Sequence, residues 1–221
     1  MNLRRKTLVI LSLTLLLLIA TIYGVTTAIL NGSYDYVEHQ TAMRDMARIR
    51  QAFEQSRMGL ATTTNDYAFW DDTYAFMETR DDAFLTSNFD VNTFESFNFS
   101  LVMLSDADGN ILFSSAYDPQ NGTLKDVDPG TLAVLQRPLF QMAGRPAEAS
   151  ISGIVQTPQG LMLIAAQPIL PNDTEGAGRG TLLMGYNLDE RLMKRISDLT
   201  LFQLHIYYLE TRLPPDVATA S

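Results

Sequence analysis

Residues 101–114 read LVMLSDADGNILFS, and this stretch decides the fold. Two apolar runs, 101–104 and 111–114, flank a polar segment that contains Asp108 and Gly109. An Asp-Gly pair between apolar runs is a strong signal for a β-hairpin, because both residues tolerate the positive φ that a tight turn requires. The stretch therefore predicts two antiparallel strands joined by this turn.

The chain after this hairpin continues with further strand and helix signals. The expected elements are a short helix at 129–140, a second hairpin made of 151–156 and 161–167, a strand at 181–186, a helix at 188–199 and a last strand at 202–208. A polar, glycine-rich loop precedes the strand at 181–186. Successive hairpins build an antiparallel sheet, and helices packed on it give the α+β class that we predict.

Before the first hairpin, residues 34–66 predict one continuous helix, because this segment contains no proline and a single glycine. Its apolar stripe recurs alternately four and three residues apart, the spacing of one helix face. The stripe consists of Ala42, Met46, Ile49, Phe53, Ser56, Leu60, Thr63 and Tyr67. The helix can bury the stripe on its own domain, on a twin helix in a dimer, or on both in succession. We expect a homodimer along 42–60.

The N-terminal part predicts a membrane anchor. Residues 7–30 carry no charged side chain, and about 20 such residues in a helix cross a hydrocarbon core of roughly 30 Å. Arg4, Arg5 and Lys6 stand directly before them, and basic residues are retained on the cytoplasmic side. We expect a single-pass protein of the inner (cytoplasmic) membrane. A cleaved signal peptide, with small residues at 26–28, is the alternative, and it too places the C-terminal domain outside the cytoplasm.

Composition excludes several classes of function. The net charge of −9 argues against nucleic acid, which proteins bind by neutralising phosphates with Lys and Arg. The absence of cysteine excludes disulfides, thiolate zinc sites and cysteine nucleophiles. The two histidines, His39 and His205, have no recognisable catalytic partner, and the motifs of serine hydrolases, zinc proteases and phosphate-binding loops do not occur. We therefore expect neither an enzyme nor a cofactor.

An aromatic and acidic stretch follows the long helix. Residues 66–76 read DYAFWDDTYAF and contain the only tryptophan of the chain. With the helix before it and Asn88 after it, this stretch resembles the signature of CHASE-type extracellular sensory domains, specifically the fourth type. In that family a Trp-Asp-Asp-x-Tyr core follows a long membrane-proximal helix, and an asparagine comes a short way downstream. The strand at 181–186 also fits, and the resemblance covers nearly all of 34–208.

The resemblance implies a periplasmic ligand-sensing domain with a PAS-like or Cache-like fold. Members of the family usually lie between two membrane helices and are joined to diguanylate cyclase, phosphodiesterase or histidine kinase output domains. Neither a second apolar span nor an output domain follows residue 208, so we expect a fragment of a longer receptor. The expected function is to bind an unknown small-molecule ligand that biases the long helix. The alternative is a structural or interaction module of the cell envelope without such a ligand.

The candidate ligand-binding residues lie in and just after the aromatic stretch. They are Tyr67, Trp70, Asp71, Asp72, Tyr74 and Asn88. If the stretch is helical, Trp70 and Tyr74 form an apolar wall, and an aspartate receives a cationic or hydroxylated ligand group. The alternative is structural, with the aromatic residues in the core and the aspartates capping a helix or accepting backbone N–H groups. A calcium site is the weaker possibility, because the aspartates match no calcium-loop spacing, and we expect no metal.

These observations predict five parts along the chain. They are a basic flank at 1–6, a transmembrane helix at 7–30, a membrane-proximal signalling helix at 31–66, an extracytoplasmic sensory domain at 67–208 and a C-terminal tail at 209–221.

Overall fold

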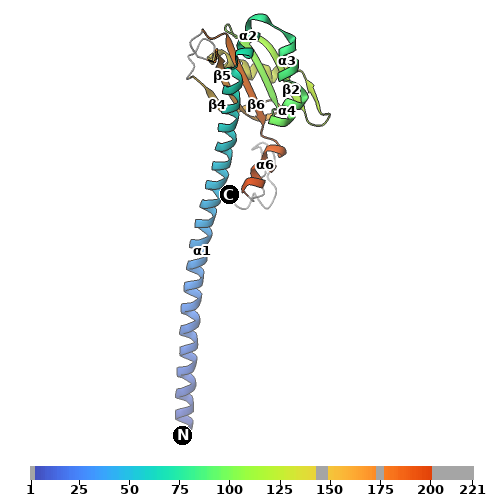
Figure 1. Cartoon of the computed structure of the whole chain (residues 1–221). Coiled ribbons are helices and arrows are strands. Elements are labelled where there is room, and N and C mark those ends of the chain that lie inside the picture. The colour runs from blue at the N-terminus through green and yellow to red at the C-terminus, as the bar shows by residue number, and fades with distance from the viewer. Residues whose placement is uncertain (1–2, 143–148, 173–176, 201–221) are drawn as a thin grey trace. The chain divides into compact units, whose positions relative to one another are not determined.

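The computed structural model describes residues 3–142, 149–172 and 177–200. Its antiparallel sheet has the strand order β3-β2-β1-β6-β5-β4 (Figure 1). The strands are β1 Leu101–Asp106, β2 Ile111–Asp118, β3 Thr123–Lys125, β4 Ile151–Thr157, β5 Gly160–Ile169 and β6 Gly180–Asn187. The predicted hairpins are β1–β2 and β4–β5, and β6 pairs with β1 on one side and with β5 on the other. Both hairpins and the α+β class are therefore confirmed, whereas the short edge strand β3 was not predicted.

Six helices accompany this sheet in the described parts of the chain. They are α1 Leu3–Ala68, α2 Asp71–Thr79, α3 Asp82–Asn88, α4 Val91–Phe97, α5 Pro129–Met142 and α6 Glu190–Thr200. The predicted helices at 34–66, 129–140 and 188–199 are thus confirmed as parts of α1, α5 and α6. The strand predicted at 202–208 lies outside the described residues.

The β1–β2 turn owes its shape to Asp106. One oxygen of its carboxylate accepts the backbone N–H groups of Asp108 (2.9 Å) and Asn110 (2.8 Å), and the other accepts the Asn110 side-chain amide (2.9 Å). Burial opposes ionisation of this carboxyl, but the hydrogen bonds from Asn110 and Asp108 outweigh it and hold its pKa below the ordinary value. Gly109 supplies the positive φ of 84° that the turn requires.

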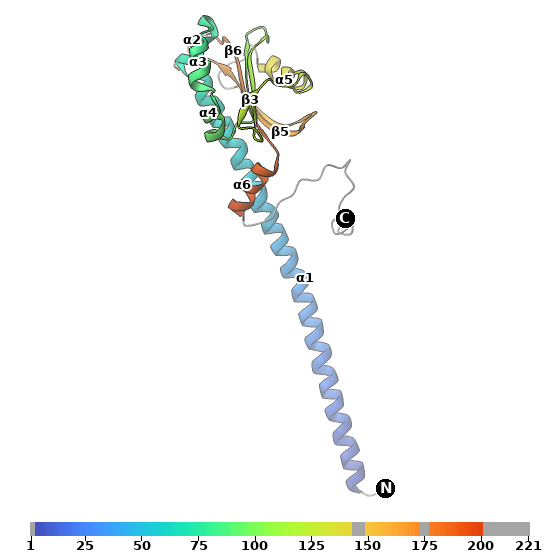
Figure 2. The same ribbon diagram turned by 90° about the vertical axis from the view of Figure 1, so that its right-hand side faces the viewer.

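Side chains alternate between two faces of the sheet, and different helices cover each face (Figure 2). Val102 and Leu104 pack in one core with residues of α2–α4 and the last part of α1. Met103 and Leu183 pack in the other core with residues of α5. The sheet is therefore covered on both faces, which explains why its central strands β1 and β6 read as continuous apolar runs.

The end of α1 belongs to the compact unit that begins at Gln51. Leu60, Thr64 and Tyr67 are buried there, and Leu60 and Tyr67 pack with the core of the sheet. The second half of the predicted apolar stripe therefore covers the chain's own domain, which was one of the stated alternatives. In the first half, the Met46 side chain is 66% exposed.

In the N-terminal unit, the stretch Arg5–Thr27 is long and apolar enough to cross a membrane. It is the one such stretch among the described residues, and none of its side chains is buried. The described part of the chain thus carries one apolar helix at its N-terminal end that is long enough to cross a membrane, as predicted.

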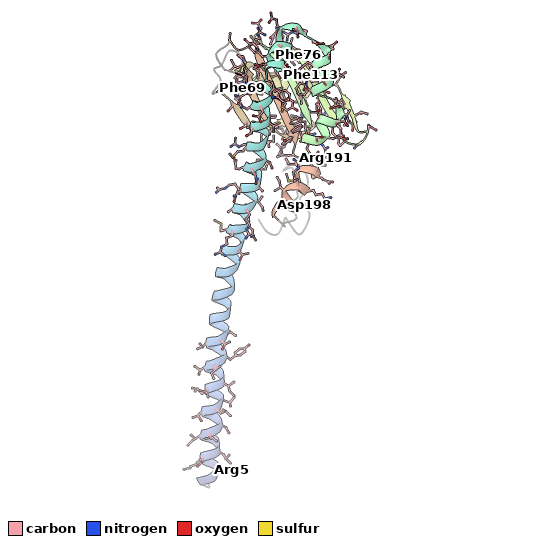
Figure 3. All side chains as sticks on the ribbon, viewed as in Figure 1. Arg5, Phe69, Phe76, Phe113, Arg191 and Asp198 are labelled. Atoms are coloured by element: carbon pink, nitrogen blue, oxygen red, sulfur yellow. The ribbon has the colours of Figure 1, made fainter. Side chains whose placement is uncertain are left out.

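Aromatic side chains fill the space between α2–α4 and the sheet. Phe76 stacks on Phe84 with 5.0 Å between ring centroids, Phe84 meets Phe89 at 5.8 Å, and Phe89 stacks on Phe113 of β2 at 5.7 Å. Phe76 and Phe113, the first and last rings of this series, are labelled in Figure 3. The aromatic density of the sequence after α1 is therefore largely a structural feature.

The N-terminus of α5 is capped by Asp128. One of its carboxylate oxygens accepts the Thr131 N–H (2.9 Å), and the other accepts the Gln159 side-chain amide (2.8 Å). Contacts with the Thr131 side chain and N–H hold the pKa of Asp128 below its ordinary value.

Replacement of this cap should weaken the domain. Asp128→Ala should cost about 1 kcal/mol of stability at neutral pH, a usual value for a lost N-cap. Because the pKa of Asp128 is lowered on folding, its contribution is present above the ordinary pKa and is lost as pH falls through the folded value. The measurement is the urea midpoint of unfolding at pH 6 and at pH 3. Asp128→Asn should reduce the difference between these two midpoints, and an unchanged difference would show that Asp128 does not make this pH-dependent contribution.

Candidate functional site

Helix α1 ends where the aromatic stretch begins. The Phe69 N–H still bonds to the Asn65 carbonyl at 3.1 Å, but Trp70 has an extended backbone with φ −69° and ψ 135°. Trp70 is the N-cap residue of α2, and its carbonyl accepts the Tyr74 N–H at 2.9 Å. The chain turns at Trp70, and this turn leaves the indole 41% exposed.

An open groove of about 560 Å³ lies at this junction. We call it the Trp70 groove, and its lining residues are Thr63, Asn65, Asp66, Tyr67, Phe69, Trp70, Phe97 and Asn172. Three of them form an aromatic wall. Trp70 stacks on Tyr67 with 4.4 Å between centroids and an interplanar angle of 26°, and Phe97 stands edge-on to Tyr67 at 6.0 Å and 86°. The volume is in the range of small-molecule sites, which combine apolar walls with a few polar groups.

The polar lining of the Trp70 groove comes from α1 and from the loop between β5 and β6. Among the described lining residues Asp66 is the only one with a charged side chain, and it is exposed. Thr63, Asn65 and Asn172 add hydroxyl and amide groups. Burial raises the pKa of the Tyr67 hydroxyl, so this group stays protonated and uncharged at neutral pH.

The loop between β5 and β6 is fastened to the α1–α2 junction. The Leu170 N–H donates to the Ala68 carbonyl at the end of α1 (3.3 Å), and the Asn172 N–H donates to the Asp71 carboxylate (3.1 Å). Asn172 thereby becomes part of the groove although it lies about a hundred positions further along the chain. Asp71 holds this loop and does not itself line the groove.

A second fastening joins the same loop to α2. The Arg179 guanidinium lies 3.8 Å from the centroid of the Tyr74 ring, donates to the Tyr74 carbonyl (3.0 Å) and pairs with Glu78 (2.9 Å). The Tyr74 hydroxyl donates to the Ala177 carbonyl at 3.1 Å. Tyr74 thus serves to hold the loop against α2.

Four of the six predicted residues therefore form two groups, and the other two lie outside both. Tyr67 and Trp70 meet in the Trp70 groove, whereas Asp71 and Tyr74 hold the loop beside it. Asp72 is exposed in the first turn of α2, outside the groove lining. The Asn88 side chain donates to the Phe84 carbonyl within α3 (2.9 Å), a contact that stabilises the helix end.

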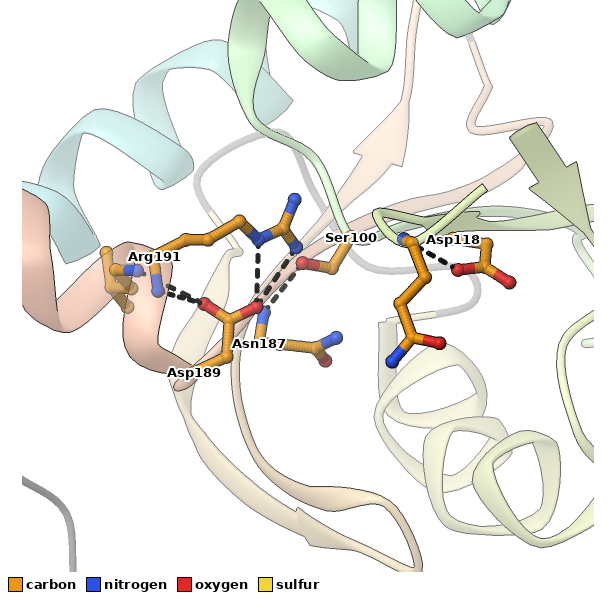
Figure 4. A network of polar contacts seen from close by, with 7 residues as sticks. Ser100, Asp118, Asn187, Asp189 and Arg191 are labelled. Atoms are coloured by element: carbon orange, nitrogen blue, oxygen red, sulfur yellow. Dashed lines mark hydrogen bonds and ion pairs between the residues drawn. The ribbon is translucent and has the colours of Figure 1, made fainter. Parts of the chain in front are cut away.

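A smaller cavity of about 90 Å³ lies on the α5 face of the sheet. Its polar lining includes Ser100, Lys125, Asp128, Gln159 and Asn187. Figure 4 shows two of these residues: the backbone N–H of Asn187 donates to the Ser100 hydroxyl at 2.9 Å, beside the Asp189–Arg191 pair. This cavity is another candidate binding site of the domain.

Comparison with known proteins agrees with this architecture. The model of the CHASE4 domain matches residues 52–207. The methanogenesis regulatory histidine kinase FilI of Methanothrix harundinacea is 26% identical over 136 residues, which cover 62% of this chain and 15% of that kinase. The chain thus spans only a small part of this curated relative.

Two solved structures share the fold. The periplasmic domain of Vibrio cholerae LuxQ has 14% identity and a TM-score of 0.50, with 72% of this chain and 70% of that chain covered. The extracellular domain of vpHK1S-Z8, a protein classed as a histidine kinase, has 13% identity and a TM-score of 0.51, with 72% and 60% covered. The domain itself is of a non-catalytic, sensory type. The chain therefore belongs to the CHASE4 domain family and carries the extracytoplasmic sensing domain of a receptor.

Proposed function

We propose that this domain binds a small molecule in the Trp70 groove and that the bound molecule acts directly on the signalling helix α1. The single observation that carries this proposal is the origin of the lining: Thr63, Asn65, Asp66 and Tyr67 all belong to α1 itself. A ligand in the groove would therefore touch the helix that leads to the membrane anchor, with no intermediate element.

The opposite side of the groove supplies a second contact. Asn172 comes from the β5–β6 loop, which is hydrogen-bonded to Ala68 and Asp71. A molecule held between Asn172 and the end of α1 would favour one packing of these two elements over another. A ligand shifts such an equilibrium only by its difference in affinity for the two states, and contacts to both moving parts provide that difference.

The receptor as a whole is part of the same proposal. We infer a protein of the cytoplasmic membrane that dimerises along the exposed half of the α1 stripe, where Met46 lies. The output domain would be a histidine kinase, the class named for the relative FilI, and the family resemblance also allows a diguanylate cyclase or phosphodiesterase. A displacement of paired α1 helices would be the input to such an output domain.

A second function rests on a different property of the same residues. Trp70 and Phe97 are 41% and 43% exposed, and exposed aromatic side chains also mark protein–protein contacts. An envelope protein docking on this patch is the alternative. The concave shape and the volume of about 560 Å³ favour a small molecule over a flat protein surface.

Removal of the indole should abolish ligand-induced stabilisation. We would measure thermal shifts of the full chain in lipid nanodiscs with amino acids, amines, sugars and organic acids. A ligand at a hundred times its Kd adds about 2.7 kcal/mol, a shift of several degrees. Each compound that stabilises the wild type should lose its effect in Trp70→Leu.

Ile154→Ala serves as the matched control, because Ile154 is an exposed apolar residue on the edge strand β4, outside the groove. It should keep the shifts of the wild type. A screen without stabilising compounds, or shifts that persist in Trp70→Leu, would count against the groove.

A further inference from the structure

We infer that the Trp70 groove selects an organic cation that carries apolar surface, such as a quaternary ammonium compound. This inference rests on the proposed function and adds the chemical class of the ligand. It follows from the charges around the groove, from its exposed aromatic rings and from its open form.

The charges around the groove are negative. Asp66 lines it, Asp71 holds its Asn172 edge, and the exposed Asp72 follows in sequence. No lysine, arginine or histidine is among the described lining residues. Arg179 belongs to the same β5–β6 loop as Asn172, but its guanidinium is paired with Glu78 and lies against the Tyr74 ring. An anionic ligand would find no positive partner in the groove and would be repelled by Asp66, whereas a cation gains from the same field.

The aromatic wall supplies the complementary interaction. Trp70 and Phe97 expose a large part of their rings beside the groove, and the electron-rich face of tryptophan is the best aromatic partner for a cation. The neighbouring pair Arg179–Tyr74, at 3.8 Å, shows the same type of contact formed within the chain itself. Methyl or methylene groups around a charged nitrogen would pack on these rings while the charge faces Asp66.

The remaining lining groups suit the rest of such a molecule. The side-chain amides of Asn65 and Asn172 and the Thr63 hydroxyl offer both donors and acceptors. The Tyr67 ring carries the wall and remains neutral, so the phenol adds no competing charge. A compact organic cation with one hydroxyl or carbonyl group would therefore place its charge near Asp66 and the rings, and its polar group would form hydrogen bonds with these side chains.

The only tryptophan of the chain lies in this groove, so its fluorescence reports binding directly. We would titrate the full chain in nanodiscs with choline and with its neutral isostere, 3,3-dimethylbutan-1-ol. Two further titrations would use putrescine and agmatine, each in place of choline. Choline should give a saturable change and bind about tenfold more tightly than the isostere. Asp66→Asn should weaken choline about threefold and leave the isostere unchanged.

Asp82→Asn is the matched control, because Asp82 is an exposed aspartate in α3 outside the groove, and it should behave as the wild type. Equal binding of choline and its isostere would overturn the cation assignment but leave the groove as the ligand site. The absence of a saturable fluorescence change with choline, putrescine and agmatine would also overturn the cation assignment. The proposed function fails separately, if compounds of other classes stabilise the chain and keep their effect in Trp70→Leu.

Discussion

Replacement of Gly180 by alanine should destabilise the domain by about 3 kcal/mol or more. Gly180 begins β6 and pairs with Asp106 at the end of β1. A Cβ at this position would overlap the Ser105 carbonyl oxygen and come within 2.6 Å of the Met77 side chain. Because the Ser105 oxygen is backbone in the centre of the sheet, it cannot move aside without disturbing the β1–β6 pairing.

Gly153→Ala is the control for this prediction. Gly153 lies in the edge strand β4, and a Cβ there would meet nothing within 4 Å. We expect no loss of stability and a gain of about 0.5 kcal/mol, since alanine restricts the unfolded chain. Thermal unfolding followed by Trp70 fluorescence compares the two variants, and equal melting temperatures would show that the approach of Ser105 to Gly180 is not as close as described.

Leu60→Ala should lower the stability of the domain by about 3 kcal/mol, within the range for a buried leucine. Leu60 is 1% exposed and packs in the core between α1 and the sheet. For a chain of this size, such a loss lowers Tm by roughly 6–12 °C. The result matters for function, because it measures how firmly the last part of α1 is built into the sensory domain.

Met58→Ala is the matched substitution on the same part of α1. The Met58 side chain is 60% exposed, so its loss should change stability by less than about 0.5 kcal/mol. If Leu60→Ala and Met58→Ala had the same small effect, α1 would not be packed on the sheet as described. A ligand bound to the domain could then not act on α1 through this packing.

Local patterns predicted most of the fold. The Asp108-Gly109 turn specified the β1–β2 hairpin because its information lies within a few residues. The four-and-three spacing placed Leu60 and Tyr67 on the buried side of α1. Thr64 is also fully buried. Its hydroxyl donates to the Leu60 carbonyl within the helix (2.8 Å), so the buried hydroxyl has a hydrogen-bond partner and threonine can stand at an apolar position. The three-residue strand β3 was missed because so short a segment has no periodicity.

The candidate site was less accessible to prediction. Tyr67 and Trp70 could be selected because they are local parts of an unusual aromatic stretch. Phe97 and Asn172 could not, because α4 and the β5–β6 loop reach the groove only through tertiary packing. The role of Arg179 was hidden for the same reason: nothing near it in the sequence indicates that it stacks on Tyr74. The polar loop before β6 was the one available signal, since such loops often carry binding residues.

A ligand that contacts the end of α1 should change the hydrogen–deuterium exchange of the full chain in nanodiscs. Exchange would be measured with and without the compound that gives the largest thermal shift. We expect slower exchange in peptides covering 60–72 and 170–172, which form the two sides of the Trp70 groove. Protection confined to 125–131 and 159–162, around the cavity on the α5 face, would contradict it and place the ligand on the other side of the sheet.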